Sequence, residues 1–240
     1  AFIDLGASLA LSSNSTVPGQ PDGVSLTLGA SVATGLAYSA GVHDWRNKLA
    51  LQLAFTQTPV IPDQFVKSAD MLKFSSAYYL RLLDWVGPFA RFGLDTSMLE
   101  GRDVRPAEAT WVKNRLDGTT ETASGLTLHL TDGFQPLTLK QSLGAFIRPY
   151  QEKEADDEFR LGLGAREVLA DGQFVVADDA DTPEIEVNEL KTYVQIGAEL
   201  AAEINGSLWD GKASYGVNAE VMIPFVADLE PDDDRNSLDL

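Results

Sequence analysis

Charged side chains recur at every second position of several apolar segments, a spacing that puts them together on one face of a strand. The basic members come mainly from the middle of the chain and the acidic members mainly from its last quarter. The candidate site residues are Lys73, Arg81, Arg91, Asp95, Lys140, Arg148, Arg160, Arg166, Glu199, Glu203 and Glu220.

Charged side chains on the inside of a closed sheet have two uses. Pairing among themselves would fill a narrow barrel of about eight to ten strands with a salt-bridged plug. A basic wall facing an acidic wall across water would instead select small anionic or zwitterionic solutes. We expect the plug if the barrel closes at ten strands and the pore if it has twelve or more.

Groups for acid–base or nucleophilic catalysis are sparse. The histidines are His43 and His129, and a hydrolase set can be drawn only from Ser124, His129 and Asp132. A catalytic set needs a nucleophile and a base within hydrogen-bond reach, and no spacing motif supports that arrangement. The absence of cysteine excludes thiolate nucleophiles and thiolate metal sites. We therefore expect no enzymatic activity and no cofactor.

Two acidic runs are candidate cation sites, either for calcium or for divalent ions bridged to lipopolysaccharide. They lack the D-x-D-x-D-G spacing of a calcium loop. We expect both runs to be solvated loop charge without a metal site. The first run consists of Asp178, Asp179 and Asp181, and the second of Asp232, Asp233 and Asp234.

The composition narrows the class of protein. The chain has 240 residues and a formal net charge of -18, so it lacks the basic face that nucleic acid requires. Its length suits one large all-β domain. It contains no run of 18 or more apolar residues, the length that a membrane-spanning helix needs.

The segment 24–40 has the clearest pattern, because Leu26, Leu28 and Val32 alternate with small or polar residues. This period of two predicts a strand, and one far longer than the usual 5–6 residues. One continuous apolar face with a small, polar opposite face is typical of a strand between lipid and a lumen. Similar patterns predict strands at 2–11, 48–56, 71–82, 89–99, 137–149, 159–168, 190–204 and 212–225, with a tenth beginning near 238.

The connections between these strands alternate in length. GVHDWRN, DWVG, QEKEADDE and NGSLWDG are short, whereas SSNSTVPGQPDG, TPVIPDQFVKS and the segments 100–125 and 170–188 are long. Bacterial outer-membrane barrels have short periplasmic turns and long external loops. Trp45, Trp85 and Trp209 fall in the short connections, where an aromatic girdle at the membrane interface would lie. The longest connection is predicted to contain a small hairpin around Asp117–Gly118.

Three segments, HDWRNKLALQLAF, KSADMLKFSSAYYLRL and EVMIPFVADLEPDDDRNSLDL, resemble an uncharacterised outer-membrane β-barrel family of Gram-negative bacteria, a domain of unknown function. The family's opening Asn-Trp and Gly-Gly element is missing here, and the family continues for about two or three more strands. The resemblance implies a location and no reaction. Its motifs, W-x-N-x-L and K-x-x-D-x-L, correspond to Trp45, Asn47, Leu49 and to Lys67, Asp70, Leu72.

These patterns together predict a single domain over 1–240, a transmembrane antiparallel up-and-down β-barrel of ten to twelve strands. We expect its amino terminus on the periplasmic side and the complete chain to extend past Leu240. The expected function is a passive pore for small solutes or a structural anchor of an envelope assembly. Its expected partners are outer-membrane lipid, lipopolysaccharide and envelope proteins that contact the long loops. The alternative is a soluble lipocalin-like barrel that binds an apolar ligand, with its large residues pointing inwards.

Overall fold

The computed structural model describes residues 1–16, 22–152, 155–179, 181–209, 211–227 and 237–239. Within these ranges the chain forms strands and no helix, and therefore no helix that could cross a bilayer. The strands are β1 (Phe2–Asn14), β2 (Gly23–Ala40), β3 (His43–Thr58), β4 (Ile61–Leu80), β5 (Val86–Thr96), β6 (Gly101–Asn114), β7 (Thr120–Thr131), β8 (Leu137–Gln151), β9 (Asp156–Leu169), β10 (Phe174–Val176), β11 (Ile185–Glu189), β12 (Tyr193–Leu208), β13 (Ala213–Ala227) and β14 (Ser237–Asp239).

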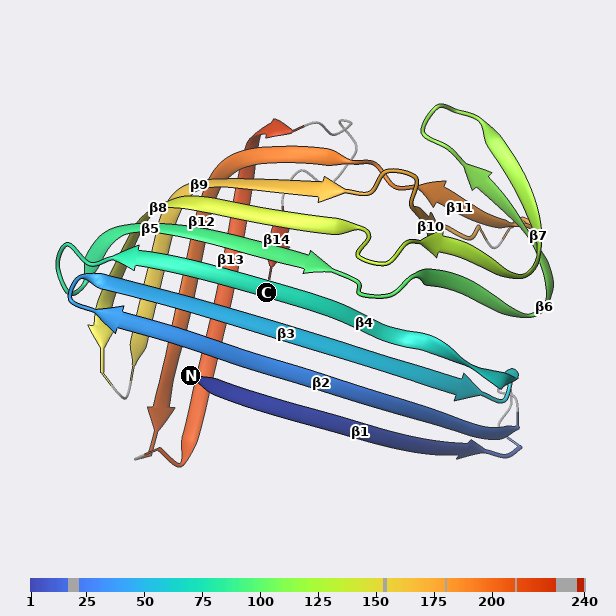
Figure 1. Ribbon diagram of the computed structural model, residues 1–240, viewed down its shortest axis with the longest axis horizontal. Helices are drawn as coiled ribbons and strands as arrows, with labels where there is room; N and C mark the ends of the chain where they lie inside the picture. Colours follow the sequence, from blue (N-terminus) through green and yellow to red (C-terminus); the bar gives the residue numbers. More distant parts are fainter. Residues whose placement is uncertain (17–21, 153–154, 180, 210, 228–236, 240) are drawn as a thin grey trace.

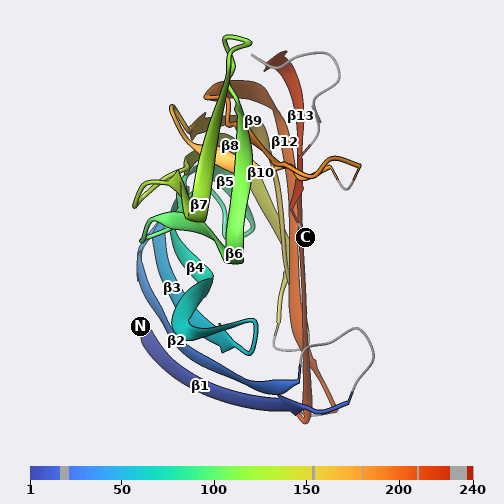
Figure 2. The same cartoon turned by 90° about the vertical axis from the view of Figure 1, so that its right-hand side faces the viewer.

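Ten of these strands form one large sheet in the order β1-β2-β3-β4-β5-β8-β9-β12-β13-β14. All neighbours in it are antiparallel. The strands lie side by side in Figure 1, and Figure 2 shows that the sheet is curled into a trough. Because β1 and β14 end the order and are not paired with each other, the sheet formed by the described residues is open.

The remaining strands form a second, four-stranded sheet in the order β10-β11-β6-β7. The β6–β7 hairpin lies in the connection between β5 and β8, and β10 and β11 lie in the connection between β9 and β12. A parallel pairing of β11 with β6 joins the two insertions. This sheet has an apolar core of Trp111, Leu128, Phe174, Ile185 and Val187, and it extends beyond one end of the large sheet (Figure 1).

Side chains along each strand of the large sheet alternate between two faces. We call the concave side of the trough the inner face and the other side the outer face. Arg91, Lys140 and Arg160 lie on the inner face, where they are paired with Ser142, Gly93 and Phe146, respectively. The outer face carries exposed apolar residues, including Ile3, Leu5, Leu9, Leu143, Leu161, Leu163, Val217 and Ile223.

The prediction of an all-β chain is confirmed, and the large sheet is antiparallel as predicted. The predicted tenth strand at the end of the chain is also present. The predicted hairpin around Asp117–Gly118 is also present, because this pair lies in the turn between β6 and β7. The pairing of the two long connections into a separate sheet was not predicted. The segment 17–21, in the predicted loop before β2, lies outside the described residues.

Several predicted connections are mostly strand, including the segment 100–125, which contains β6 and the start of β7. GVHDWRN is mostly strand, since β3 begins at His43 and leaves only residues 41–42 between β2 and β3. TPVIPDQFVKS is also mostly strand, and β3 and β4 continue to a turn at residues 59–60. A β-bulge near Phe55 shifts their register, and a bulge reverses the alternation from which strands are predicted.

Candidate functional site

A buried ionic network lies on the inner face, at the end of the sheet where β2–β3 and β4–β5 are joined by short turns. Arg148 Nη1 is 3.2 Å from Asp44 Oδ2, and Arg148 Nη2 is 2.8 Å from Glu158 Oε2. Arg160 Nη1 is 3.2 Å from Glu158 Oε1. The Tyr79 hydroxyl donates a 2.6 Å hydrogen bond to that same oxygen. All five residues are buried.

Arg46 completes this network, with Nη2 2.8 Å from Asp44 Oδ2 and Nη1 3.6 Å from Glu158 Oε2. Its guanidinium also lies 5.2 Å from the centre of the Tyr79 ring, within cation–π range. Buried charges are tolerated when they are paired and hydrogen-bonded, and here the partners come from β3, β4, β8 and β9. We call this network the short-turn cluster; its members are Asp44, Arg46, Tyr79, Arg148, Glu158 and Arg160.

Aromatic rings and glycines make room for the cluster. The rings of Tyr79 and Phe146 meet edge-on with centroids 5.0 Å apart, and Tyr79 also lies beside Phe89. Phe89 is paired across the strands with Gly144, where a Cβ atom would lie 2.2 Å from a backbone oxygen of β9. Only glycine fits at that position, and it allows β8 and β9 to approach while the rings cover the vacant space.

A cavity of about 660 Å³ lies on the inner face next to the cluster. Its lining runs from Phe2 of β1 to Glu220 of β13, which means that strands from both ends of the large sheet face one space. The cavity is strongly charged, and its ionisable lining residues are Lys48, Lys73, Arg91, Lys140, Arg166, Asp95 and Glu220.

Two ion pairs cross this cavity's lining. Lys73 Nζ lies 3.2 Å from Asp95 Oδ2 on the neighbouring strand. Arg91 of β5 pairs with Glu220 of β13, although β8, β9 and β12 lie between these strands in the sheet. Four strand spacings in a flat sheet would separate them by roughly 19 Å, so the contact requires the tight curl visible in Figure 2.

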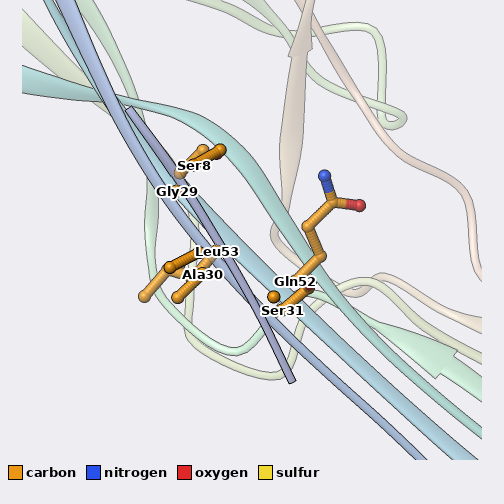
Figure 3. A pocket seen from close by; sticks show the side chains of 9 residues that line it. Ser8, Gly29, Ala30, Ser31, Gln52 and Leu53 are labelled. Atoms are coloured by element: carbon orange, nitrogen blue, oxygen red, sulfur yellow. The ribbon is translucent and has the colours of Figure 1, made fainter. Parts of the chain in front are cut away.

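One part of the inner face of β1–β3 has a different surface. A hollow of about 150 Å³ lies on β1–β3, and the lining residues that are labelled in Figure 3 carry no charge. Gly6 lies opposite Ser31, and Gly29 lies opposite Ser8. Charge is therefore concentrated on the inner face from β3 to β13.

The predicted site residues divide into groups. Arg148 and Arg160 belong to the short-turn cluster, whereas Lys73, Arg91, Asp95, Lys140, Arg166 and Glu220 line the cavity. Glu199 is buried on the inner face, and Glu203 is paired with Glu158 across β9 and β12. Arg81 lies just past the end of β4 and donates to Ser39 Oγ and Gly41 O at the β2–β3 turn. It is not among the residues that line the cavity.

Several residues of the site were missed. Asp44 and Arg46 were assigned to a turn, and Glu158 to another, although all three continue the alternation of the strand beside them. The alternation in the predicted strands puts Lys48 and Tyr79 on the inner side, but this position alone does not predict that Lys48 lines a cavity and that Tyr79 binds Glu158. Extending each alternating pattern to its last matching residue would have identified Asp44, Arg46 and Glu158.

The three predicted girdle tryptophans lie at the short-turn end of the large sheet. Trp45 of β3 is paired with Tyr78 and donates a 2.9 Å hydrogen bond to Ser76 Oγ. Trp85 lies between β4 and β5, and Trp209 directly follows β12. All three are exposed, whereas the fourth tryptophan, Trp111, is the buried centre of the small sheet.

The K-x-x-D motif has a structural role. Lys67 Nζ lies 2.8 Å from Asp70 Oδ2 and also donates to the backbone oxygen of Leu99. Asp70 accepts hydrogen bonds from the backbone N–H groups of Met98 and Leu99. This pair therefore ties the segment after β5 to β4.

The hydrolase set does not assemble. Ser124 and His129 are five positions apart on β7, which corresponds to roughly 16 Å along a strand. The Ser124 hydroxyl instead lies 3.3 Å from the Thr110 hydroxyl. His129 Nε2 lies 3.4 Å from Asp132 Oδ1, so a base and an acid are adjacent without the nucleophile.

Asp178, Asp179 and Asp181 lie in the part of the chain that the structure describes. No group of three or more potential His, Cys, Asp or Glu ligands occurs there. Asp179 Oδ1 accepts from the backbone N–H of Asp181 at 3.1 Å, a contact within the loop. Asp232, Asp233 and Asp234 lie outside the described residues.

Comparison of the chain with protein-family models, with curated proteins and with solved structures gives no match.

Proposed function

We propose that this protein is a transmembrane β-barrel of a Gram-negative outer membrane. One observation carries the proposal: of two consecutive residues of β9, Arg160 is 8% exposed and Leu161 is 60% exposed. In water, an exposed leucine beside a buried arginine is unfavourable. Burial of apolar surface stabilises a protein by about 25 cal/mol per Å², and a buried charge is costly to desolvate. Lipid around the outer face removes the first problem, since the apolar side chains then face hydrocarbon, and the ion pair with Glu158 offsets the second.

The same observation disfavours the soluble lipocalin-like alternative. A barrel of that kind would hold its large apolar residues inside and its polar residues in water. Here the outer face has exposed Leu5, Leu9 and Leu143, and the inner cavity is lined by basic and acidic residues.

Exposed tryptophans indicate how the proposed barrel is oriented in the membrane. Trp45, Trp85 and Trp209 gather at the short-turn end, as tryptophan does at membrane–water interfaces. Short turns face the periplasm in bacterial barrels. The proposal therefore puts the first residues of β1 on the periplasmic side and the four-stranded sheet on the external side.

A sheet cannot leave an unpaired edge in hydrocarbon, because each unpaired backbone group there costs several kcal/mol. The proposal therefore includes closure of the sheet between β1 and β14, directly or through further strands, into a barrel of ten to twelve strands. The curl of the sheet supports this step, since residues of β1 and β13 already line one cavity.

The role that we propose for the barrel is that of a structural anchor for an envelope assembly. The short-turn cluster bridges the inner face from β3 to β9 with paired, buried side chains, which favours a plugged lumen over an open channel. The four-stranded sheet gives the external side a folded surface for a partner. The proposal also includes membership of the uncharacterised barrel family, on its two strand motifs.

Membrane extraction tests the location. The full chain is expected to stay in the membrane fraction until detergent is added, and its band is expected to move between unboiled and boiled samples on a gel. Release by salt or alkali without detergent, and one band position for both samples, would refute the membrane assignment.

Planar-bilayer recording tests the role. The wild-type protein is expected to give no conductance steps, whereas Arg148→Ala, which removes two contacts of the cluster, is expected to allow them. Arg102→Ala is the control, because Arg102 pairs with Glu100 beside the four-stranded sheet. Regular steps from the wild-type protein would overturn the anchor and favour the passive pore.

A further inference from the structure

A line of polar side chains crosses part of the outer face of the large sheet. Residues directly opposite each other on neighbouring strands lie on the same face, and one such line across β3, β4, β5 and β8 consists of Asn47, Ser76, Phe92 and Gln141. Gln141 is two residues before Leu143, which is exposed on the outer face, so this line also faces outwards. We call these four residues the polar row.

The lines on either side of the polar row contain only aliphatic and aromatic residues. The line nearer the short turns consists of Trp45, Tyr78, Ala90 and Leu143. The line further from the short turns consists of Leu49, Phe74, Leu94 and Leu139. The polar row is therefore enclosed by apolar surface. In the proposed orientation it lies on the membrane-interior side of Trp45.

The two amides of the polar row are not satisfied by the sheet itself. Gln141 is exposed and Asn47 is half-buried, and neither side chain makes a hydrogen bond in the described part of the chain. Ser76 differs, because its hydroxyl accepts a 2.9 Å hydrogen bond from Trp45 Nε1. A polar group in hydrocarbon is costly without a partner, and polar residues at such positions commonly mark a functional surface.

We propose that the polar row is the centre of a homodimer interface in the membrane, where the Asn47 and Gln141 amides of one copy hydrogen-bond to the second copy. A carboxamide contains both donors and an acceptor, so the same group on a second copy is complementary to it. A twofold dimer presents the same surface from both subunits. Acyl chains have no hydrogen-bonding group, so lipid cannot take the place of the second copy. The inference rests on the membrane proposal and names one partner for the barrel.

The apolar lines around the polar row supply the area of contact. Trp45, Phe92 and Leu143 are exposed, and aromatic residues are enriched in protein interfaces. In hydrocarbon the association of apolar surfaces gains nothing from leaving water, so it depends on packing and on hydrogen bonds between the subunits. Removing the amides is therefore expected to weaken the dimer although the apolar surface remains.

Light scattering of the full chain in mild detergent measures the number of copies per particle, and we expect two. Asn47→Leu combined with Gln141→Leu removes both amides and is expected to weaken dimerisation about tenfold or more. Leucine suits a lipid-facing position, and the band shift between unboiled and boiled samples checks that the variant is folded. Gln52→Leu is the matched control, because it removes an amide from the hollow on the inner face. It is expected to change dimerisation less than about twofold.

Cross-linking in isolated membranes tests the interface without detergent. The chain has no cysteine, so Ala90→Cys introduces a single thiol beside the polar row. A short bismaleimide is expected to link two copies of this variant. Ala198→Cys is the control, since Ala198 lies on the same line of register pairs as Ala90 but three strands away, on β12.

The outcomes separate this inference from the membrane proposal. A protein that needs detergent but is monomeric, in detergent and in membranes, would overturn the dimer and leave the membrane proposal standing. Equal weakening by Gln52→Leu, an unchanged dimer in the double variant, or cross-linking of Ala90→Cys only to a different protein would also overturn it. Release of the chain from membranes without detergent would refute the membrane proposal, and the dimer in lipid with it.

Discussion

Trp111 of the four-stranded sheet is fully buried, whereas Leu161 of the ten-stranded sheet is 60% exposed. Charged residues show the opposite contrast. Arg115 and Glu121 pair on the surface of the small sheet, while Arg160 is buried in the large one. The chain therefore buries its apolar residues in the usual way where the small sheet forms. Exposed apolar residues beside buried charged residues are a feature of the large sheet, and our membrane proposal was made to account for this feature.

The largest expected effect comes from removing the apolar core of the small sheet, because this change should affect one sheet and not the other. Trp111→Ala is expected to cost about 3–5 kcal/mol, as is usual for a large aromatic residue lost from a core. The loss should be confined to the small sheet, because its core residues come only from β6, β7, β10 and β11. Hydrogen exchange should accelerate in these strands and remain slow in β8 and β9.

Trp85→Ala is the control for this change, since Trp85 is exposed in a turn. It should leave exchange in the small sheet unchanged. Accelerated exchange throughout both sheets after Trp111→Ala would show that they unfold as one unit, and the comparison between them would fail.

Two leucines with the same exposure provide the next test. Leu161 on the outer face of β9 and Leu116 beyond β6 are each 60% exposed. In water, arginine at either position should be nearly neutral. In a bilayer, Leu161→Arg should cost about 2–4 kcal/mol if it lies near the midplane, whereas Leu116→Arg should stay within about 0.5 kcal/mol.

Urea unfolding of the protein refolded into liposomes measures this difference. Equal free energies of unfolding for the two variants would mean that both leucines face water, and the bilayer explanation of the contrast would be lost.

The smallest effect concerns a carboxylate at the tip of the small sheet. Asp117 accepts hydrogen bonds from the hydroxyl and the backbone N–H of Thr119, and these lower the pKa of Asp117. Its stabilising contribution is therefore complete above the unfolded pKa of about 3.9 and is lost as the pH falls through the lowered folded pKa. Thr119→Val removes the hydroxyl and should raise the pKa of Asp117.

Carboxyl NMR titration measures this change. Glu186 is the internal control, because a hydrogen bond from the Thr182 hydroxyl lowers its pKa independently. An unchanged Asp117 pKa in Thr119→Val would mean that the hairpin tip is not ordered in water as the structure has it.

The strands of the large sheet were predictable where the alternation is regular over many residues, as in β2 and β9. The start of β4 was not predicted, because the bulge near Phe55 and Lys67 changes which residues share a face. The β6–β7 hairpin was predictable from the local Asp117–Gly118 signal. The pairing of this hairpin with β11 was not predictable. The strands β10 (Phe174–Val176) and β11 (Ile185–Glu189) contain too few residues to show a period of two.

The face of the sheet on which a side chain lies was easier to predict than the residue with which it makes contact. The alternation indicated that Arg91 and Glu220 share the inner side of the sheet, and the structure brings them together. That contact depends on the curl of strands far apart in the sequence, which no local pattern contains. Asp44 and Glu158 were missed for a simpler reason, since each stands at the very start of a strand.

The parallel pairing of Trp111 with Ile185 has a consequence for the order of folding. Neighbouring antiparallel strands can form by local hairpin closure, whereas this pairing closes a loop that contains β7, β8, β9 and β10. The entropy of closing so long a loop is recovered only after the intervening strands have been brought together. We therefore expect Trp111 to become buried late in refolding, after the strands of the large sheet have paired.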